Sequence, residues 1–345
     1  MEKDISKINL PIVKNFNGID IVKLIMAIVV ISIHTHPFEE CSNVYVLKIY
    51  NGLIIHMAVP FFLCTSGFLC FFNNKENKLK NYIKKTYKHY ILWNCIYFPI
   101  TLYNYILLGN SFKICLFDFL KNFLFVGAQY YSLPLWYLLG ITYSMSLILI
   151  FKKAHMSDTS ILIISIIIST ICCIYKYYPE KLLSLFGENI ICINFIKLLF
   201  NGNGRLFYSM LYIVIGMILA KHYTQFSIKI EYIIMCFIGF GILRMLFINS
   251  IGINDILIIC FCISFFVLVL QIDIKHNKII YWCKKCSIVF YFMHMIFFFL
   301  YTIFIKTNSY YGIKPFLTCV LGCTLFSIIV ILTEKKFKFI NYIFS

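Results

Sequence analysis

The sequence has few charged residues, and most of those are of one sign. Asp, Glu, Lys and Arg make up 13% of the 345 residues, with 14 acidic against 31 basic side chains. Soluble domains carry about 25% charged residues, so this chain has too little polar surface to cover a water-exposed fold. Hydrophobic residues make up 61% of it, and its mean hydropathy is +0.86. Lipid must therefore cover much of the protein.

The motifs of several common function classes are also missing. The lysines lie in short clusters between apolar runs, so no basic domain exists to hold a duplex and nucleic acid is excluded as a partner. No Walker-type phosphate loop and no 20–50-residue repeat is present. Cys283 and Cys286 form a C-x-x-C spacing without a second pair, and most of the 15 Cys lie in apolar segments. We therefore predict no metal site.

Long apolar runs dominate what remains. A run of about 20 apolar residues crosses a bilayer as a helix, which predicts an all-α integral membrane protein, a bundle of about ten transmembrane helices. The predicted spans are residues 19–38, 50–72, 90–109, 134–151, 159–178, 206–220, 230–248, 254–271, 287–305 and 315–333. The run at 114–128 is too short and contains Asp118 and Lys121, so an interfacial or re-entrant helix is expected there.

The distribution of basic residues predicts the orientation of these spans. With the N-terminus inside, the inside segments hold 20 Lys and Arg and the outside segments hold 9; Lys23 and Arg244 lie within spans. We therefore predict cytoplasmic N- and C-termini in a multi-pass protein of the cell membrane. A cytoplasmic tail covers 1–18, a ten-span membrane domain covers 19–333, and a short basic cytoplasmic tail covers 334–345.

The first span, GIDIVKLIMAIVVISIHTHPF (18–38), is unusually rich in ionisable groups. Lys23 and His34 are eleven residues apart, about three helical turns, so both project from one face with about 16 Å between them along the axis. Asp20 lies one turn before Lys23, close enough to pair with it. Lys23 snorkelling to headgroups and His34 as an interfacial histidine are the structural alternatives. Ionisable residues inside a membrane are costly and usually functional.

Later segments, in chain order, strengthen a functional interpretation. They are HMAVPFFLCTSGFLCFF (56–72), LPLWYLLGITYSM (133–145), GNGRLFYSMLYIVIGMILAK (202–221) and CSIVFYFMHMIFFF (286–299). Together with a basic residue, ten intervening positions and a histidine in the first span, they resemble the membrane-bound acyltransferase-3 family. The members it resembles are O-acetyltransferases that modify bacterial surface polysaccharides. Lys23 stands where the family more often has Arg.

The resemblance implies that His34 is essential for acyl transfer. Histidine suits this role because its unperturbed pKa near 6.5 lets it act as a base near neutral pH. Lys23 and Asp20 join His34 in the predicted catalytic group, with Lys23 stabilising the thioester end or the developing charge. His34 either deprotonates the acceptor hydroxyl or accepts the acyl group itself, and the sequence leaves both routes open.

Two further sets of residues are predicted to bind substrates. Substrate binding is assigned to Ser66, Trp136, Arg205 and His294. Their alternatives are helix packing, an aromatic belt, a helix-end anchor and a core hydrogen-bonding histidine, respectively. In the loop 75–89, Lys84, Lys85 and Lys88 are predicted to bind the phosphates of coenzyme A. Attraction to anionic lipid is the alternative for these lysines.

The predicted function is therefore a membrane acyltransferase. It would move an acyl group, in particular acetyl, from cytosolic acetyl-CoA to a hydroxyl of a cell-surface polysaccharide or lipid-linked glycan. Membrane lipid, acyl-CoA and the glycan are the expected partners, with a second copy of the chain as a further candidate. The alternatives are a transporter or flippase of a small molecule or glycolipid, and a non-catalytic membrane scaffold. The broken helices that mark many transporters are not evident.

Overall fold

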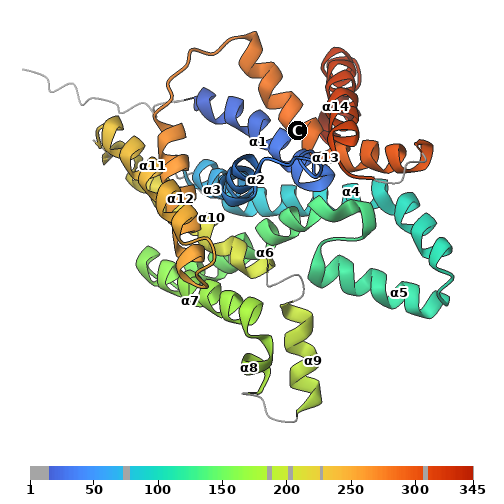
Figure 1. The fold of residues 1–345 in the computed structure, drawn as a ribbon, viewed down its shortest axis with the longest axis horizontal. Coiled ribbons are helices and arrows are strands. Elements are labelled where there is room, and N and C mark those ends of the chain that lie inside the picture. Colours follow the sequence, from blue (N-terminus) through green and yellow to red (C-terminus); the bar gives the residue numbers. More distant parts are fainter. Residues whose placement is uncertain are drawn as a thin grey trace, which may run out of the picture.

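A computed structural model describes residues 15–72, 78–184, 189–200, 205–225, 228–305 and 310–344. The described residues form helices and no strand, as predicted, and the longer helices lie side by side in one bundle (Figure 1). Eight helical segments are long and apolar enough to cross a membrane by length and composition. The protein is therefore an all-α integral membrane protein, and the count of ten spans stays a prediction.

Every predicted span coincides with a helix. The α-helices are α1 (Asn17–Thr35), α2 (Val44–Ile49), α3 (Ile55–Phe71), α4 (Lys78–Leu108), α5 (Phe112–Lys121), α6 (Trp136–Lys153), α7 (Asp158–Tyr177), α8 (Pro179–Ser184), α9 (Ile190–Leu199), α10 (Arg205–His222), α11 (Ile230–Leu246), α12 (Ile253–Leu270), α13 (Lys278–Phe304), α14 (Ile313–Thr333) and α15 (Lys338–Ile343). Short π- or 3₁₀-helical turns are η1 (Tyr50–Ile54), η2 (Asn122–Val126), η3 (Tyr130–Leu135) and η4 (Tyr223–Gln225).

Two predicted boundaries are wrong for the same reason. The predicted loop 75–89 is helical from Lys78 onward, so α4 begins twelve residues before the predicted span, and α13 begins nine residues before its own. Apolar runs stop where the lysines begin, but Lys is a good helix former. Helices therefore continue past the apolar segment, and the C-x-x-C pair lies within α13. Residues 75–77 of the predicted loop lie outside the described residues.

The helix ends gather at two opposite ends of the bundle. Phe16, just before α1, contacts Phe68 at the end of α3 and Tyr223 after α10, with ring centroids 4.9 and 5.2 Å apart. Lys152 and Lys221, at the ends of α6 and α10, both pair with Asp158 at the start of α7. We call this the lysine-rich end. It brings together segments that the charge distribution assigns to the cytoplasm.

At the opposite end, the backbone N–H at position 312, before α14, donates to the carbonyl of Thr35 at 2.8 Å. Arg244, near the end of α11, donates through Nε to Asn254 Oδ1 at 3.2 Å. Its side chain is only 1% exposed, so it is held inside the protein by a neighbouring helix and not extended into the headgroups.

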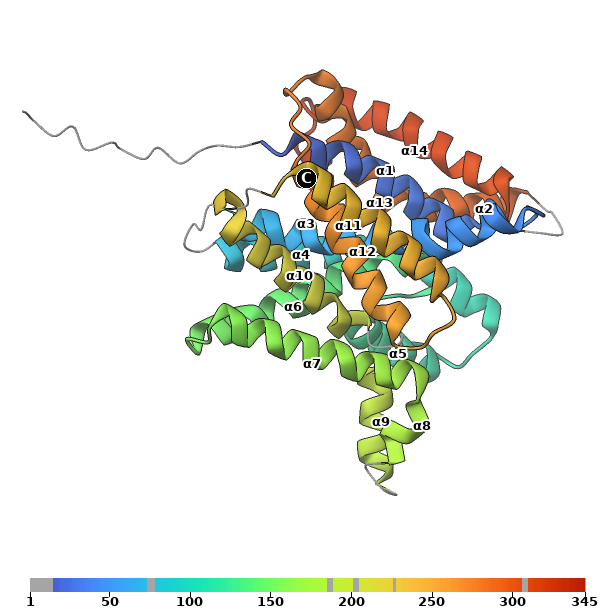
Figure 2. The same ribbon diagram turned by 60° about the vertical axis from the view of Figure 1, so that its left-hand side comes forward.

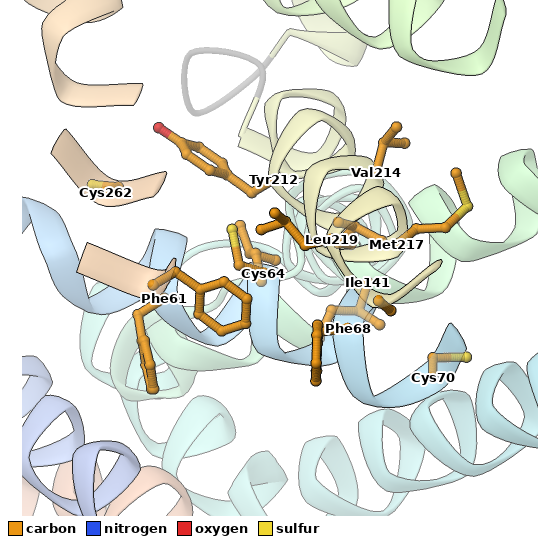
Figure 3. Packing of buried hydrophobic residues seen from close by; sticks show 14 of the residues in the cluster. Phe61, Cys64, Phe68, Cys70, Ile141, Tyr212, Val214, Met217, Leu219 and Cys262 are labelled. Carbon is orange, nitrogen blue, oxygen red and sulfur yellow. The ribbon is translucent and has the colours of Figure 1, made fainter. Parts of the chain in front are cut away.

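The centre of the bundle is the crossing of α3 with α10. Phe61, Cys64 and Phe68 of α3 pack with Tyr212 and Met217 of α10 in one buried cluster (Figure 3). α1 lies beside α3 and α13, and α14 packs against α13 and also contacts α1 (Figures 1 and 2). α13 is therefore the helix that the ionisable face of α1 meets.

The ends of the chain differ in how much is described. Residues 1–14 of the predicted tail 1–18 lie outside the described residues. In the predicted tail 334–345, the Phe344 ring lies 5.6 Å from that of Trp93 on α4. Helix α5 overlaps the helix predicted at 114–128, and it has no buried residue.

Candidate functional site

The ionisable residues of α1 are arranged as their spacing predicts. Lys23 Nζ lies 3.2 Å from Asp20 Oδ1, and each side chain is 19% exposed. Lys23 lines a cavity to which α13 contributes Tyr291, and the His34 ring contacts the His294 ring, also on α13. Both groups therefore face the same neighbouring helix, separated by three helical turns of α1.

The cavity around Lys23 lies toward the lysine-rich end. It has a volume of about 330 Å³, within the range of small-molecule sites, roughly 300–1,000 Å³. Helices α1, α3, α4, α6 and α13 all contribute to its wall. Its polar lining residues are Lys23, Thr65, Ser66, Tyr82, Lys85, Thr86, His89, Tyr137, Ser287 and Tyr291. We call it the Lys23 cavity.

Hydroxyl groups connect three helices across this cavity. Ser66 Oγ lies 3.0 Å from the Tyr137 hydroxyl, which also donates to the carbonyl of Phe62 at 3.0 Å. The Tyr137 ring lies 5.6 Å from that of Tyr291, and the Tyr291 hydroxyl donates to the carbonyl of Pro134 at 2.7 Å. Ser66 therefore belongs to the cavity wall, and its neighbour Gly67 supplies the close helix packing.

The three predicted coenzyme-binding lysines separate into two groups. Lys85 lines the Lys23 cavity, whereas Lys84 and Lys88 are exposed on the same helix, α4, and do not line it. Of these three lysines, one therefore adds its charge to that of Lys23 at the cavity, and two lie outside it. A cavity of this size accommodates an extended arm of a ligand but not a whole coenzyme.

The two histidines of the predicted site meet further along the same helices. The ring centroids of His34 and His294 lie 5.4 Å apart, with the ring planes at 31°. His294 is 1% exposed, and its Nδ1 lies 2.7 Å from the carbonyl oxygen of Phe290. His34 is partly exposed, one residue from the end of α1. The pair joins the predicted catalytic residue to a predicted substrate-binding residue.

Trp136 lies at a second cavity, of about 440 Å³, toward the opposite end of the bundle. Lys176 Nζ, at the end of α7, lies there 3.3 Å from Asp255 Oδ1, at the start of α12. Asp255 is 7% exposed, and the Tyr208 hydroxyl of α10, 3.1 Å from that of Tyr212, also lines the space. We call it the Trp136 cavity. It offers aromatic surface beside a carboxylate, an ammonium and hydroxyls.

The two cavities do not hold all the predicted residues. Neither is lined by His34 or His294. Arg205 is the first residue of α10, but its side chain lies outside the described part of the structure. The described residues contain no group of three or more His, Cys, Asp and Glu side chains that a metal ion could bridge.

Several residues that build the site carry no signal in the sequence. Tyr137 and Tyr291 are two of 25 tyrosines in aromatic-rich helices, and nothing local marks them as hydrogen-bond partners. Lys176 and Asp255 are 79 positions apart and meet only because the end of α7 lies beside the start of α12. Asp255 is the exception, because an acidic residue within an apolar run is costly inside a membrane and therefore marks a candidate functional residue.

The arrangement offers the components of a group-transfer site. A cation and hydroxyls line a cavity at one end, and a pair of imidazoles lies about three helical turns away. A neutral imidazole both accepts and donates protons, and a buried ammonium stabilises negative charge that develops on an oxygen or sulfur atom. Such a set suits proton transfer and nucleophilic chemistry.

Similarity to known proteins gives the chemistry its class. Residues 16–334 match the acyltransferase domain of the acyltransferase 3 family. Two amino-acid racemases of Enterococcus faecalis are similar to part of the chain, one 34% identical over 131 residues and the other 31% identical over 128 residues. Those segments make up 36% and 35% of this chain.

The same segments make up only 17% of each racemase, so this chain matches a small part of those proteins. No solved structure matches the chain. The family match runs from the residue before α1 to the residue after α14 and so includes both cavities and both histidines. The chain belongs to the acyltransferase 3 family, whose acyltransferase domain covers nearly all of this membrane protein.

Proposed function

We propose that this acyltransferase moves an acetyl group from cytosolic acetyl-CoA to a hydroxyl of a cell-surface polysaccharide or lipid-linked glycan, in the cell membrane. One observation carries the proposal. Lys23 and His34 both face α13, with the Lys23 cavity at the lysine-rich end and the histidine pair nearer the opposite end. This arrangement separates a donor-side cation from an acceptor-side base along a single helix.

The donor side of the proposal is the Lys23 cavity. The thioester arm of the donor enters it at the lysine-rich end, while Lys84 and Lys88 on the outer surface of α4 attract the phosphates of the coenzyme. Lys85 lies between these two regions because it lines the cavity. Ala27 and Ile31, both buried, follow Lys23 on the same face of α1 toward His34. The acyl arm must pass them to reach the histidine.

The chemical step needs one base and no metal. In direct transfer, His34 takes the proton of the acceptor hydroxyl as its oxygen attacks the thioester carbonyl carbon, a C–O bond forms and the C–S bond breaks. The proton then moves from His34 to the departing sulfur. In the covalent route, a His34 nitrogen attacks the carbonyl carbon first, a C–N bond forms, and the C–S bond breaks to release the thiolate of coenzyme A. In a second step the hydroxyl oxygen attacks the same carbon, the C–N bond breaks, and the hydroxyl proton ends on the released thiolate.

The acceptor side of the proposal includes the Trp136 cavity. Its indole and tyrosine rings offer flat apolar surface, and the Lys176–Asp255 pair offers both donors and acceptors for hydroxyl groups. Trp136 thus keeps its proposed role in substrate binding, with Lys176 and Asp255 added. Arg205 stays in the proposal from the sequence alone, because its side chain lies outside the described part of the structure. The proposal treats this cavity as a holding site for a sugar of the glycan, with the reacting hydroxyl at His34.

The test uses cells that express the wild-type protein, His34→Ala, or no protein. Alkali-labile acetyl groups on the surface glycans are measured by mass spectrometry, and labelled acetyl transfer from acetyl-CoA is measured with the purified protein. We expect the wild type to add acetyl groups and His34→Ala to lose transfer by about 100-fold or more. The control is His222→Ala, at an exposed histidine, which should keep wild-type transfer.

Wild-type transfer rates in His34→Ala would contradict the role of His34. A wild-type protein that neither hydrolyses acetyl-CoA nor modifies glycans, but takes up labelled small molecules or glycolipids into vesicles, would instead support a transporter. The acetyl-transfer assay and the uptake assay, both made with the same purified protein, therefore distinguish an acyltransferase from a transporter.

A further inference from the structure

We infer that His294 is a positioning residue for His34: its imidazole accepts a hydrogen bond from the His34 ring when that ring becomes positively charged during acyl transfer. The inference rests on the proposed role of His34. It gives His294 a different role from the substrate binding expected from the sequence.

The hydrogen bonding of His294 fixes which of its nitrogens carries the proton. Nδ1 lies 2.7 Å from the carbonyl oxygen of Phe290, one turn earlier on α13. A carbonyl oxygen only accepts, so Nδ1 must donate and therefore carries the hydrogen. In the neutral imidazole the other nitrogen, Nε2, is then a hydrogen-bond acceptor. The hydrogen bond to the backbone of α13 thus orients the ring, and the lone pair on Nε2 faces away from Phe290.

That lone pair has no hydrogen-bond partner. His294 Nε2 is buried without one, in a side chain that is 1% exposed. A buried polar atom left without a partner destabilises the folded protein, and such atoms are unusual enough to require an explanation. A core histidine that served only to pack α13 would not need this acceptor, since a phenyl ring of similar size would fill the same space.

The His34 ring lies beside the His294 ring that carries this acceptor. The two ring centroids are 5.4 Å apart and the planes are inclined by 31°, so the rings are closer to coplanar than perpendicular. Two imidazoles joined by one N–H···N hydrogen bond lie in nearly this relation. Catalytic hydrogen bonds are often long in the free enzyme and shorten when substrate binds.

The chemistry of transfer creates a donor that fits the acceptor. In the direct route, one His34 nitrogen gains the hydroxyl proton, which leaves an imidazolium whose other N–H is a strong donor. In the covalent route, one nitrogen bonds to the acyl carbon, and the acylated ring again has a positively charged N–H. His294 Nε2 accepts this hydrogen without taking the proton, so no further reactant is needed. A base oriented by a third group is the general form of such sites.

Two substitutions separate the bond that orients His294 from the acceptor that it offers. Asn in place of His294 puts an amide nitrogen near the position of Nδ1, so it keeps the bond to Phe290 and lacks the acceptor. Gln reaches further and puts an amide oxygen near the position of Nε2. We expect His294→Asn to lower kcat for acetyl transfer by about 10-fold or more, with little change in KM for acetyl-CoA. We expect His294→Gln to recover a substantial part of the loss.

The controls keep stability apart from function. His222→Asn and His222→Gln change an exposed histidine whose Nδ1 contacts Gln225, and both should transfer acetyl at the wild-type rate. Each variant is purified and compared by size-exclusion chromatography after heating, so a misfolded variant is recognised before its kinetics are measured.

Each outcome decides the matter. A His294→Asn protein with wild-type kcat, or Asn and Gln variants of equal activity in folded proteins, would overturn the positioning role while leaving His34 as the transfer residue. A higher KM at unchanged kcat would also overturn it and would return His294 to substrate binding. If the wild type transfers no acetyl group, the proposed function fails first, and the role of His294 fails with it.

Discussion

A lysine inside a membrane span requires a polar partner, and Lys23 has one in Asp20 at 3.2 Å. The pair still faces a cavity, because both side chains are 19% exposed and Lys23 lines the Lys23 cavity. A paired ammonium that also reaches a cavity has a hydrogen free to meet a ligand. This geometry distinguishes a functional lysine from one that only snorkels to the headgroups.

The charge at position 23 is therefore expected to matter more than its exact side chain. Lys23→Met should lower kcat for acetyl transfer by about 100-fold, the effect of losing one donor that stabilises developing charge. Lys23→Arg should stay within about 10-fold of the wild type, since a guanidinium also pairs with a carboxylate. Steady-state kinetics with labelled acetyl-CoA measure both variants.

The matched control is Lys48→Met, a lysine of α2 that lies in neither cavity. It should keep wild-type kinetics. Equal loss in Lys23→Met and Lys23→Arg would show that shape, and not charge, is what position 23 supplies, and full activity in both would remove Lys23 from the catalytic group.

The spacing of residues within one helix predicted this part of the site, but it could not predict the contacts between helices. The Asp20–Lys23 pair and the common face of Lys23 and His34 follow from helical geometry alone. The partner of His34 was not derivable, because His294 follows it by 260 positions and many side chains on α13 could have faced α1. Likewise, only the fold brings Tyr137 to Ser66.

Among the elements, the α3–α10 crossing depends on two glycines. A Cβ atom at Gly67 of α3 would lie 2.1 Å from the carbonyl oxygen of Ile213, and one at Gly216 of α10 would lie 2.1 Å from the carbonyl oxygen of Cys64. Both obstacles are backbone atoms and cannot turn aside. Small residues at such contacts let membrane helices approach closely, and this crossing holds both Ser66 and the core cluster in place.

Gly67→Ala should therefore push α3 and α10 apart. We expect it to destabilise the protein by about 1–3 kcal/mol, as overpacking does in tightly packed cores, and to reduce the amount that survives heating in detergent. Gly239→Ala is the matched control, since a Cβ at this α11 position meets no atom within 4 Å. It should leave the surviving fraction unchanged or slightly raised, because Ala favours helix more than Gly does. Equal survival of the two variants would contradict the close crossing.

Helix identity was predictable from the apolar runs, whereas helix length was not. Each run coincides with a helix because burial in lipid or protein leaves the backbone no other way to satisfy its hydrogen bonds. The lysines that begin α4 and α13 ended the runs without ending the helices. Position 36 shows the reverse error, because the left-handed backbone of His36, at φ 46°, ends α1 before the predicted limit of 38.

For the whole molecule, the gathering of helix ends bears on topology. Three sets of contacts place helix ends at the lysine-rich end. The contact of Phe16 with Phe68 brings the start of α1 to the end of α3, and the ion pairs of Asp158 bring the start of α7 to the ends of α6 and α10. The ion pair of Lys285 with Glu334 adds the end of α14. Segments that the charge distribution assigns to the cytoplasm thus share one end. An alternating path of helices is the simplest chain course that achieves this.

The helices α10 and α11 decide between eight and ten spans, because they have 18 and 17 residues and do not meet the length and composition criteria for crossing. If both cross, a segment after Gln225 is cytoplasmic. If neither crosses, that segment stays on the outer side with the end of α7. With the N-terminus inside, as predicted, both counts place the segment around Gly252 outside and the C-terminus in the cytoplasm.

An epitope tag inserted after Gln225 tests this directly. Antibody binding to intact and permeabilised cells is compared for that tag, for one after Gly252 and for one at the C-terminus, in proteins that still transfer acetyl groups. We expect the Gln225 tag to bind antibody only after permeabilisation, like the C-terminal tag, and the Gly252 tag to bind on intact cells. A Gln225 tag that binds on intact cells would reduce the spans to eight. It would also place Lys221 and its ion-pair partner Asp158 on different sides of the membrane, which their direct contact forbids. Ten crossings are therefore the arrangement that agrees with both the charge distribution and the ion pairs of the lysine-rich end.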